Sequence, residues 1–458
     1  MSGIRHDKKQ YLQLCSDLSY VYGGLEVCAT TESCASDEPL TVLAAGALAR
    51  IGDRGSFDGL LELFAHPSAA VRQAAIAGLN SIGHPGLGAR IETMLGDASP
   101  NIRESAARVA GYFGYAGCIE GLFRLCDDEN ENVRRAAVEG LPFMEDPRVP
   151  ERLANLLRFG SPRVRAAAAQ AVAHLDTAAA LSPLLAALRD PDVWVRYYAA
   201  RALGQHGAPE SLEPLACIAQ SDDAHHVRVA AIEAVGRLGG ARSVALLAPI
   251  AENDSDDLAR AALQSLGRIN HPDSLPPLLA ALRSSLAQRR IESIRALGER
   301  GGDGVAEELQ AVAARDREST VQHAAITALS QLSTPESIAA IIALANEPAH
   351  RAVCVTALVH CGTKQLENVA RGLTHAQESS RRVVVEVLGR LKSAPASEQL
   401  CRALDDASSA VRAAAATALG HLGTREAGRK LAQMARSDAN PAARRAAHDA
   451  LKRETVWS

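Results

Sequence analysis

Aromatic side chains are scarce in this sequence and missing from more than half of its length. Its 458 residues include two Trp, seven Tyr and six Phe. None of them lies between Tyr198 and Trp457. The second half must therefore pack with aliphatic side chains alone, and any surface that binds through aromatic rings must lie in the first half.

The sequence also lacks an excess of either charge. It carries 49 Lys and Arg against 53 Asp and Glu, a formal net charge of −4. A charge of this size gives no general attraction to nucleic acid or to an anionic membrane. A nucleic-acid partner is therefore not expected from the composition.

Cysteine pairs, apolar leaders and long apolar runs are missing as well. The nine cysteines are scattered without a CxxC pair, which favours free thiols in a reducing compartment over a disulfide framework. No apolar segment of signal-peptide type follows Met1 to Gln10, and no uncharged run approaches the length of a membrane span. We expect a cytoplasmic protein without a membrane partner.

One helical pattern recurs along nearly the whole chain. Its clearest copy is DPDVWVRYYAARALG at residues 190–204, which we expect to form one helix. Asp190 and Asp192 are suited to accept the first free backbone N–H groups, and Gly204 is suited to close the helix in the left-handed conformation. The apolar positions between them recur at the spacing of one buried face: Val195, Tyr198, Ala199, Ala202 and Leu203.

The position of Arg196 is the anchor of this repeat. Equivalent positions occur fourteen times along the chain, at spacings of 29 to 32 residues. They are Thr41, Arg72, Arg103, Arg134, Arg165, Arg196, Arg228, Ala259, Arg290, Gln322, Arg351, Arg381, Arg412 and Arg444. This regularity predicts an all-α solenoid of about fourteen two-helix repeats, each burying its apolar stripe against the next.

The pattern of Asp, five residues, Val-Arg, then Ala-Ala and Ala-Leu-Gly resembles the HEAT-repeat family. It is similar in particular to the short bacterial form also found in phycobilisome lyases, over roughly residues 24 to 453. The resemblance implies that the Asp and the Arg six residues later form a structural ladder between neighbouring repeats. Six repeats carry both residues: Asp97 and Arg103, Asp128 and Arg134, Asp190 and Arg196, Asp222 and Arg228, Asp406 and Arg412, and Asp438 and Arg444. The departures are Ala259 and Gln322 in place of Arg, and Ser284, Ala345 and His375 in place of Asp.

The repeat frame divides the chain into four parts. Residues 1–23 are expected to form an N-terminal capping helix, with a docking peptide as the alternative. Residues 24–53 form a degenerate first repeat, 54–453 the HEAT-like array, and 454–458 a C-terminal tail. An atypical end repeat would shield the open core of the array.

No arrangement of residues typical of catalysis or metal binding is visible. His174, His360 and His421 share the position nine after the anchor, but they lie in repeats too far apart to meet on one metal. We interpret the acidic turn at 127–131 as a helix start, because carboxylates there face the partial positive charge of free N–H groups. No phosphate-binding glycine loop or nucleophile elbow occurs. We therefore expect no catalytic residue, no metal and no cofactor.

The remaining candidate is an exposed ridge. In arrays of this kind the second helices line the concave side, and positions one, five and nine after the anchor would project from it. We assign partner binding to such positions in the third to seventh repeats: Arg108, Tyr112, Arg135, Glu139, Phe143, Gln170, His174, Tyr197, Arg201, Glu233 and Arg237. Tyr112, Phe143 and Tyr197 would be apolar anchors. Tyr112 and Phe143 fit the core under the following turn equally well.

Three functions are compatible with these features. The favoured one is a non-catalytic scaffold or adaptor that holds a protein partner in the concave groove. The second is a chromophore attachment factor or chaperone similar to the bilin lyases, which predicts that bilin absorbance copurifies. The third is a nucleic-acid-binding protein of HEAT type, which requires a basic stripe where this ridge alternates in sign.

Overall fold

Helices make up all the regular structure in the part of the chain that the structure describes. The structure is a computed structural model, and its described residues are 38–51, 54–253, 255–422 and 425–452. They contain 27 α-helices, α3 to α29, together with seven short 3-10 turns and no strand. None of these helices has both the length and the apolar composition needed to cross a membrane. The predicted all-α fold class is confirmed.

The helices alternate between two roles, which follow the predicted repeat. Each odd-numbered helix contains an anchor position or begins at one, and is the second helix of its repeat. These second helices are α3 (Glu38–Ile51), α5 (Ala69–Ile82), α7 (Pro100–Phe113), α9 (Glu131–Gly140), α11 (Pro162–Val172), α13 (Val193–His206), α15 (His225–Leu238), α17 (Asp256–Arg268), α19 (Ala287–Arg300), α21 (Ser319–Leu332), α23 (Arg351–Gly362), α25 (Glu378–Leu391), α27 (Ser409–Leu422) and α29 (Pro441–Leu451).

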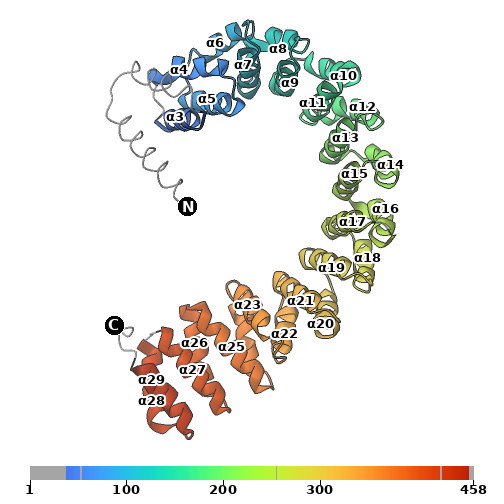
Figure 1. Cartoon of the computed structure of the whole chain (residues 1–458). Coiled ribbons are helices and arrows are strands. Elements are labelled where there is room, and N and C mark those ends of the chain that lie inside the picture. The colour runs from blue at the N-terminus through green and yellow to red at the C-terminus, as the bar shows by residue number, and fades with distance from the viewer. Residues whose placement is uncertain (1–37, 52–53, 254, 423–424, 453–458) are drawn as a thin grey trace. The chain divides into compact units, whose positions relative to one another are not determined.

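Each even-numbered helix is the first helix of a repeat. They are α4 (Phe57–Glu62), α6 (Leu87–Met94), α8 (Ile119–Leu125), α10 (Val149–Phe159), α12 (Thr177–Ala187), α14 (Leu212–Ser221), α16 (Gly240–Asn253), α18 (Leu275–Ala281), α20 (Val305–Arg315), α22 (Pro335–Leu344), α24 (Leu366–Ala370), α26 (Ala394–Ala403) and α28 (Arg425–Ser437). In the first half of the chain, Figure 1 shows α9, α11 and α13 in one layer and α8, α10 and α12 in the other. The apolar core lies between these two layers.

The chain divides into two units, residues 1–234 and 235–458, with the division inside α15. Both units are built from the same alternation of first and second helices. Residues 1–37 and 453–458 lie outside the described residues, and so do the predicted capping helix, the part of the degenerate first repeat before residue 38 and the C-terminal tail.

Helix α13 shows how the repeat sequence forms a second helix. The Asp192 carboxylate caps its start by accepting hydrogen bonds from the backbone N–H groups of Trp194 and Val195, at 2.9 and 3.3 Å. The predicted end was wrong, because the helix continues through Gly204 to His206 and closes at Gly207, where φ is +67°. A left-handed residue at this place favours glycine.

The glycine eight after the anchor has another function, which explains the error. In α7 this residue is Gly111, and a Cβ added there would lie 2.4 Å from the Cα of Gly140 in α9. Gly236 and Gly420 are in the same position, where a Cβ would approach the Cβ of Ser265 at 2.5 Å and that of Ala450 at 2.7 Å. Glycine here permits the close approach of neighbouring second helices.

Candidate functional site

Arg–Asp ion pairs join successive repeats in both units. In each of six pairs the guanidinium of one repeat donates two hydrogen bonds to the carboxylate of the next, with Nε···Oδ2 distances of 2.7 to 2.8 Å. We call these pairs rungs: Arg103–Asp128, Arg165–Asp190, Arg196–Asp222, Arg290–Asp316, Arg381–Asp406 and Arg412–Asp438. Both side chains of every rung are at most 17% exposed.

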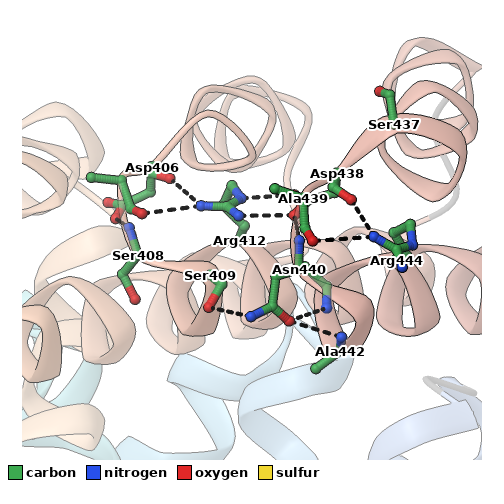
Figure 2. Close-up of polar contacts among 12 residues, drawn as sticks. Asp406, Ser408, Ser409, Arg412, Ser437, Asp438, Ala439, Asn440, Ala442 and Arg444 are labelled. Carbon is green, nitrogen blue, oxygen red and sulfur yellow. Dashed lines mark hydrogen bonds and ion pairs between the residues drawn. The ribbon is translucent and has the colours of Figure 1, made fainter.

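Each rung residue also holds the turn of its own repeat. Figure 2 shows Arg412 between Asp406 and Asp438. Its Nη1 donates to the backbone carbonyls of Asp406 and Ala407 at 2.9 and 3.1 Å, and its Nη2 donates to the Asp438 carboxylate at 2.8 Å. Asp438 in turn accepts a hydrogen bond from the N–H of Asn440 at 2.8 Å. The hydrogen bonds from Arg412 lower the pKa of the Asp438 carboxyl, and they outweigh burial, which raises it. The guanidinium and the carboxylate of this rung are therefore both engaged in contacts that hold the fold.

Not every residue that the sequence assigned to the ladder belongs to one of these six rungs. Arg134 was assigned to the ladder, but the following repeat offers it no Asp, and its Nη1 donates only to the carbonyls of Asp128 and Glu129. Arg444 likewise holds its own turn. Asp97 accepts from the N–H of Ser99 at 2.7 Å.

Two anchor Arg residues contact a Glu of the next repeat instead of an Asp, and one anchor position that lacks Arg still makes one of its hydrogen bonds. The Nη2 of Arg72 lies 2.9 Å from Glu104, and that of Arg351 lies 2.8 Å from Glu386. The side-chain amide of Gln322 donates to the carbonyl of Asp316 at 2.7 Å, a bond to its own turn like the one that Arg412 makes to Asp406. The complete rung Arg290–Asp316 lies among the departures between residues 253 and 381.

Arg and Glu side chains on α7 and α9 form a continuous charged strip. Arg108 contacts Glu104 and Glu139 at 3.2 Å each, and Arg135 contacts Glu139 at 3.4 Å. The buried Glu104 also holds Arg72. On these two helices the predicted alternation of sign is thus a network in which Arg108 and Arg135 face carboxylates.

Two large aromatic side chains of the first unit, one near the end of α7 and one in the 3-10 turn after α9, are exposed. Tyr112 is 69% exposed and Phe143 is 52% exposed, so neither lies in the core. The Phe143 ring lies 5.3 Å from the ring of His174, the equivalent position of the next repeat. We call the exposed side of α7, α9, α11 and α13 the aromatic face.

Trp194 and three neighbours form a second group of rings, which extends from this face to His226 of α15. Trp194 is 51% exposed, and its ring lies 5.7 Å from Tyr197 and 5.1 Å from His226. Tyr198 packs beside Tyr197 at 5.3 Å and is half-buried. The guanidinium of Arg201 lies over the Tyr197 ring at 5.6 Å, a cation–π contact.

A family model described as HEAT repeats matches the chain over most of its length. The matched segments are residues 87–173, 150–228, 181–267, 217–298, 257–330, 275–358 and 363–452. The chain belongs to the HEAT-repeat family. Among proteins with curated descriptions, none matches this sequence.

Solved structures similar to this HEAT-repeat chain show the same fold. One is importin beta crystallised in an ammonium sulfate condition, with 15% identity and a TM-score of 0.52, where the match covers 98% of this chain and 70% of that one. Another is the yeast importin-beta Kap95p, in a study of how its binding changes the switch loops of RanGDP. It has 12% identity and a TM-score of 0.50, and the match covers 94% of this chain and 72% of that one.

The residues that the sequence assigned to partner binding do not form one continuous site on the HEAT repeats. Phe143 and His174 lie together at one end of the second helices, whereas Tyr197 belongs to the group around Trp194 at the other end. Gln170 and Arg201 are exposed, and Glu233 is half-buried. Arg237 is exposed and belongs to the second unit.

The ridge is also less regular than a row of identical helices would make it. Phe143 lies in a 3-10 turn after α9 instead of in the helix, because Pro142 has no N–H to donate to the carbonyl four residues back. Position nine of the next repeat, His174, likewise follows the end of α11 at Val172. His226 was not assigned from sequence, because its ring partner lies one repeat away.

The described residues contain no group of three or more His, Cys, Asp or Glu side chains placed to hold a metal ion. In the acidic turn at 127–131, Asp128 belongs to a rung, Asn130 caps α9, and Asp127 pairs with Arg152. Each of these polar groups is accounted for by contacts that stabilise the fold.

Proposed function

We propose that this protein is a non-catalytic scaffold that holds a protein partner against the aromatic face of its first unit. The observation that carries the proposal is that Tyr112, Phe143 and Trp194 are each at least half exposed there. Large aromatic side chains are enriched in protein interfaces, where they often contribute most of the binding energy. The HEAT-repeat fold itself typically binds proteins.

The charged strip beside these rings supports a protein partner over a nucleic acid. Arg108 and Arg135 both face Glu139, so their charges are largely compensated. A nucleic-acid groove needs uncompensated cations along the phosphate path. Compensated Arg and Glu side chains at the rim of apolar anchors instead give an interface its register and specificity.

The bilin-lyase alternative, and the bacterial origin, rest on the short form of the repeat alone. A bilin bound to the purified protein would add a visible absorbance band, which gives this alternative its own test. The proposal made here expects a colourless protein that captures a polypeptide.

A cytoplasmic location is part of the proposal. The six described cysteines are free thiols, and five of them are buried. Burial raises the pKa of the Cys126 and Cys354 thiols to about 12 each, so they stay protonated and unreactive at neutral pH. Small buried thiols of this kind serve as core residues in a reducing compartment.

The test is partner capture by the variant Phe143→Ala with Tyr197→Ala. The wild-type protein first captures and identifies a partner by affinity purification with mass spectrometry, and calorimetry then measures the affinity. Each truncated anchor is expected to cost about 2 kcal/mol of binding, a loss of about 30-fold per residue. Circular dichroism should be unchanged, because both side chains lie outside the core.

Phe159→Ala is the matched control. Phe159 is 73% exposed, but it lies at the end of the first helix α10, under the guanidinium of Arg158. Its truncation should leave the affinity unchanged. Normal binding by the double variant, or loss of binding through Phe159→Ala, would place the partner elsewhere.

A further inference from the structure

The second unit carries a groove on the exposed side of its second helices. It has a volume of about 550 Å³ and is lined by residues of α25 and α27, together with Arg351 of α23. This volume is within the range of sites that bind small molecules or short peptide segments. No Phe, Tyr or Trp lines it.

Four permanent cations surround the groove, and only one carboxylate lies among them. The cations are Arg351, Arg382, Arg390 and Lys392, and the carboxylate is Glu386. Both oxygens of Glu386 are already occupied, because Arg351 and Arg390 lie 2.8 and 2.7 Å from them. The groove therefore keeps a net positive charge.

Arg382 and Lys392 have no carboxylate partner among the described residues. Both are exposed, and both line the groove. Lys392 ends α25 with φ of +47°, a conformation that is uncommon outside glycine. Their charges are thus available to an anion from outside the chain.

The hollow exists because the facing helix presents small side chains. Ala414, Thr417 and Ala418 of α27 line the groove opposite α25, and Val385 adds an aliphatic contact. Gly389 brings the two helices close, since a Cβ added there would lie 3.0 Å from the Cβ of Ala418. An apolar floor with cations at its rim fits a ligand that has both carboxylates and an aliphatic side chain.

We propose that this groove binds an acidic segment of a partner protein, with its carboxylates at Arg382 and Lys392 and an aliphatic side chain on the floor. Charge complementarity favours this occupant, and the floor favours a peptide over a bare anion. A single-stranded nucleic acid would stack its bases on aromatic rings, which this lining lacks. The site lies in the second unit and does not depend on the aromatic face.

The test is fluorescence anisotropy with the full-length protein and a fluorescein-labelled peptide of Glu and Asp residues that contains one Leu. Binding should be saturable and should weaken with salt. Arg382→Glu with Lys392→Glu should lower the affinity about tenfold or more, because each reversal replaces attraction by repulsion. Thr417→Trp should lower it similarly by filling the groove without changing its charge.

Arg429→Glu with Arg436→Glu is the matched control, since it makes the same change in charge at exposed sites on the first helix α28. It should bind the peptide normally. Equal loss in the control, or normal binding by the Thr417→Trp variant, would mean that the peptide responds only to net charge. Equal binding of a peptide with Gln for Glu and Asn for Asp, displacement by an equal concentration of inorganic phosphate, or tighter binding of single-stranded DNA would also overturn the proposal.

Discussion

The second helices of the two units present different chemistry on the same framework. On the first unit, Tyr112, Phe143 and Trp194 are exposed, and Arg108 and Arg135 on the same face contact Glu139. On the second unit, Ala414 and Thr417 leave a groove whose cations outnumber its one carboxylate. The first surface suits an apolar partner patch, and the second suits an acidic segment.

The framework beneath the two faces is the same. The rung Arg103–Asp128 in the first unit and the rung Arg412–Asp438 in the second have Nε···Oδ2 distances of 2.8 and 2.7 Å and similar burial. These rungs hold the turns before the second helices and use none of the positions on the exposed faces. Because stability and surface chemistry reside in different residues, each face is free to differ.

The largest expected effect compares a rung of the first unit with a position of the second unit where Gln replaces the anchor Arg. Arg196→Ala leaves the Asp222 carboxylate, whose side chain is 4% exposed, without its cation. We expect a loss of about 3 kcal/mol in local stability. Gln322→Ala in the second unit removes one neutral hydrogen bond within a turn, at a cost of about 1 kcal/mol.

Hydrogen exchange resolved by peptide measures both effects. Faster exchange in the Arg196→Ala protein should be confined to the repeats around α13 and α15, because energy in an array is a sum of local terms. Equal effects of the two substitutions would contradict a stabilising role for the rungs. In the unmodified protein, residues 250–390 should exchange faster than 60–230, because Ala259 and Gln322 replace the anchor Arg there.

The repeat frame was predictable because its signals are local. The spacing of anchors such as Arg196 and the apolar period of each second helix follow from positions within one repeat. The rung partners are not local. Arg165 has no Asp six residues before it, yet it pairs with Asp190 of the next repeat. Arg134 does follow an Asp, Asp128, but the next repeat has no Asp at the pairing position, and Arg134 holds its own turn.

The exposure of the aromatic side chains on the aromatic face could not be predicted from the sequence either. Phe143 is exposed because Pro142 ends α9 and turns the chain, and the ring contacts of Trp194 depend on His226 in the next repeat. The groove depends on the small size of Ala414 and Ala418 opposite a charged helix, which becomes visible only when the helices are packed. Side-chain exposure, ring contacts and the groove therefore depend on contacts between repeats, which the periodic pattern within one repeat does not predict.

A smaller expected effect compares the pH dependence of the stability that one rung contributes in each unit. Burial raises the pKa of the Asp222 carboxyl, but the hydrogen bonds from Arg196 and the Ala224 N–H lower it overall, and Arg412 lowers that of Asp438. A carboxyl whose folded pKa lies below its unfolded value of about 3.9 stabilises the fold fully above that pH, and this contribution is lost as the pH falls through the folded pKa.

We therefore expect Asp222→Asn and Asp438→Asn each to cost about 2 kcal/mol at pH 7, because each replaces a charged hydrogen-bond acceptor by a neutral one. At about pH 3, below the unfolded pKa of about 3.9, the difference from the unmodified protein should shrink, because the unfolded chain then takes up a proton at the native Asp and the stabilisation from its lowered folded pKa is progressively lost. Thermal melts at both pH values measure this. An unchanged difference would show that hydrogen-bond geometry, and not charge, is what the rungs supply.

The smallest effect concerns the starts of the second helices that carry the two faces. Asp192 caps α13 through its side chain, with backbone angles of −81° and 130°, whereas Gln377 begins α25 at −83° and 131° without a side-chain cap. Because the backbones match, Gln377→Asp should accept the free N–H groups of α25 and raise stability by about 0.5 to 1 kcal/mol, while Asp192→Ala should lose about 1 kcal/mol. Urea unfolding of the two variants, with the slope checked for constancy, measures both changes. If Gln377→Asp leaves the midpoint unmoved while Asp192→Ala lowers it, α25 is held by its packing and its rung Arg381–Asp406, and the cap matters only on the first unit.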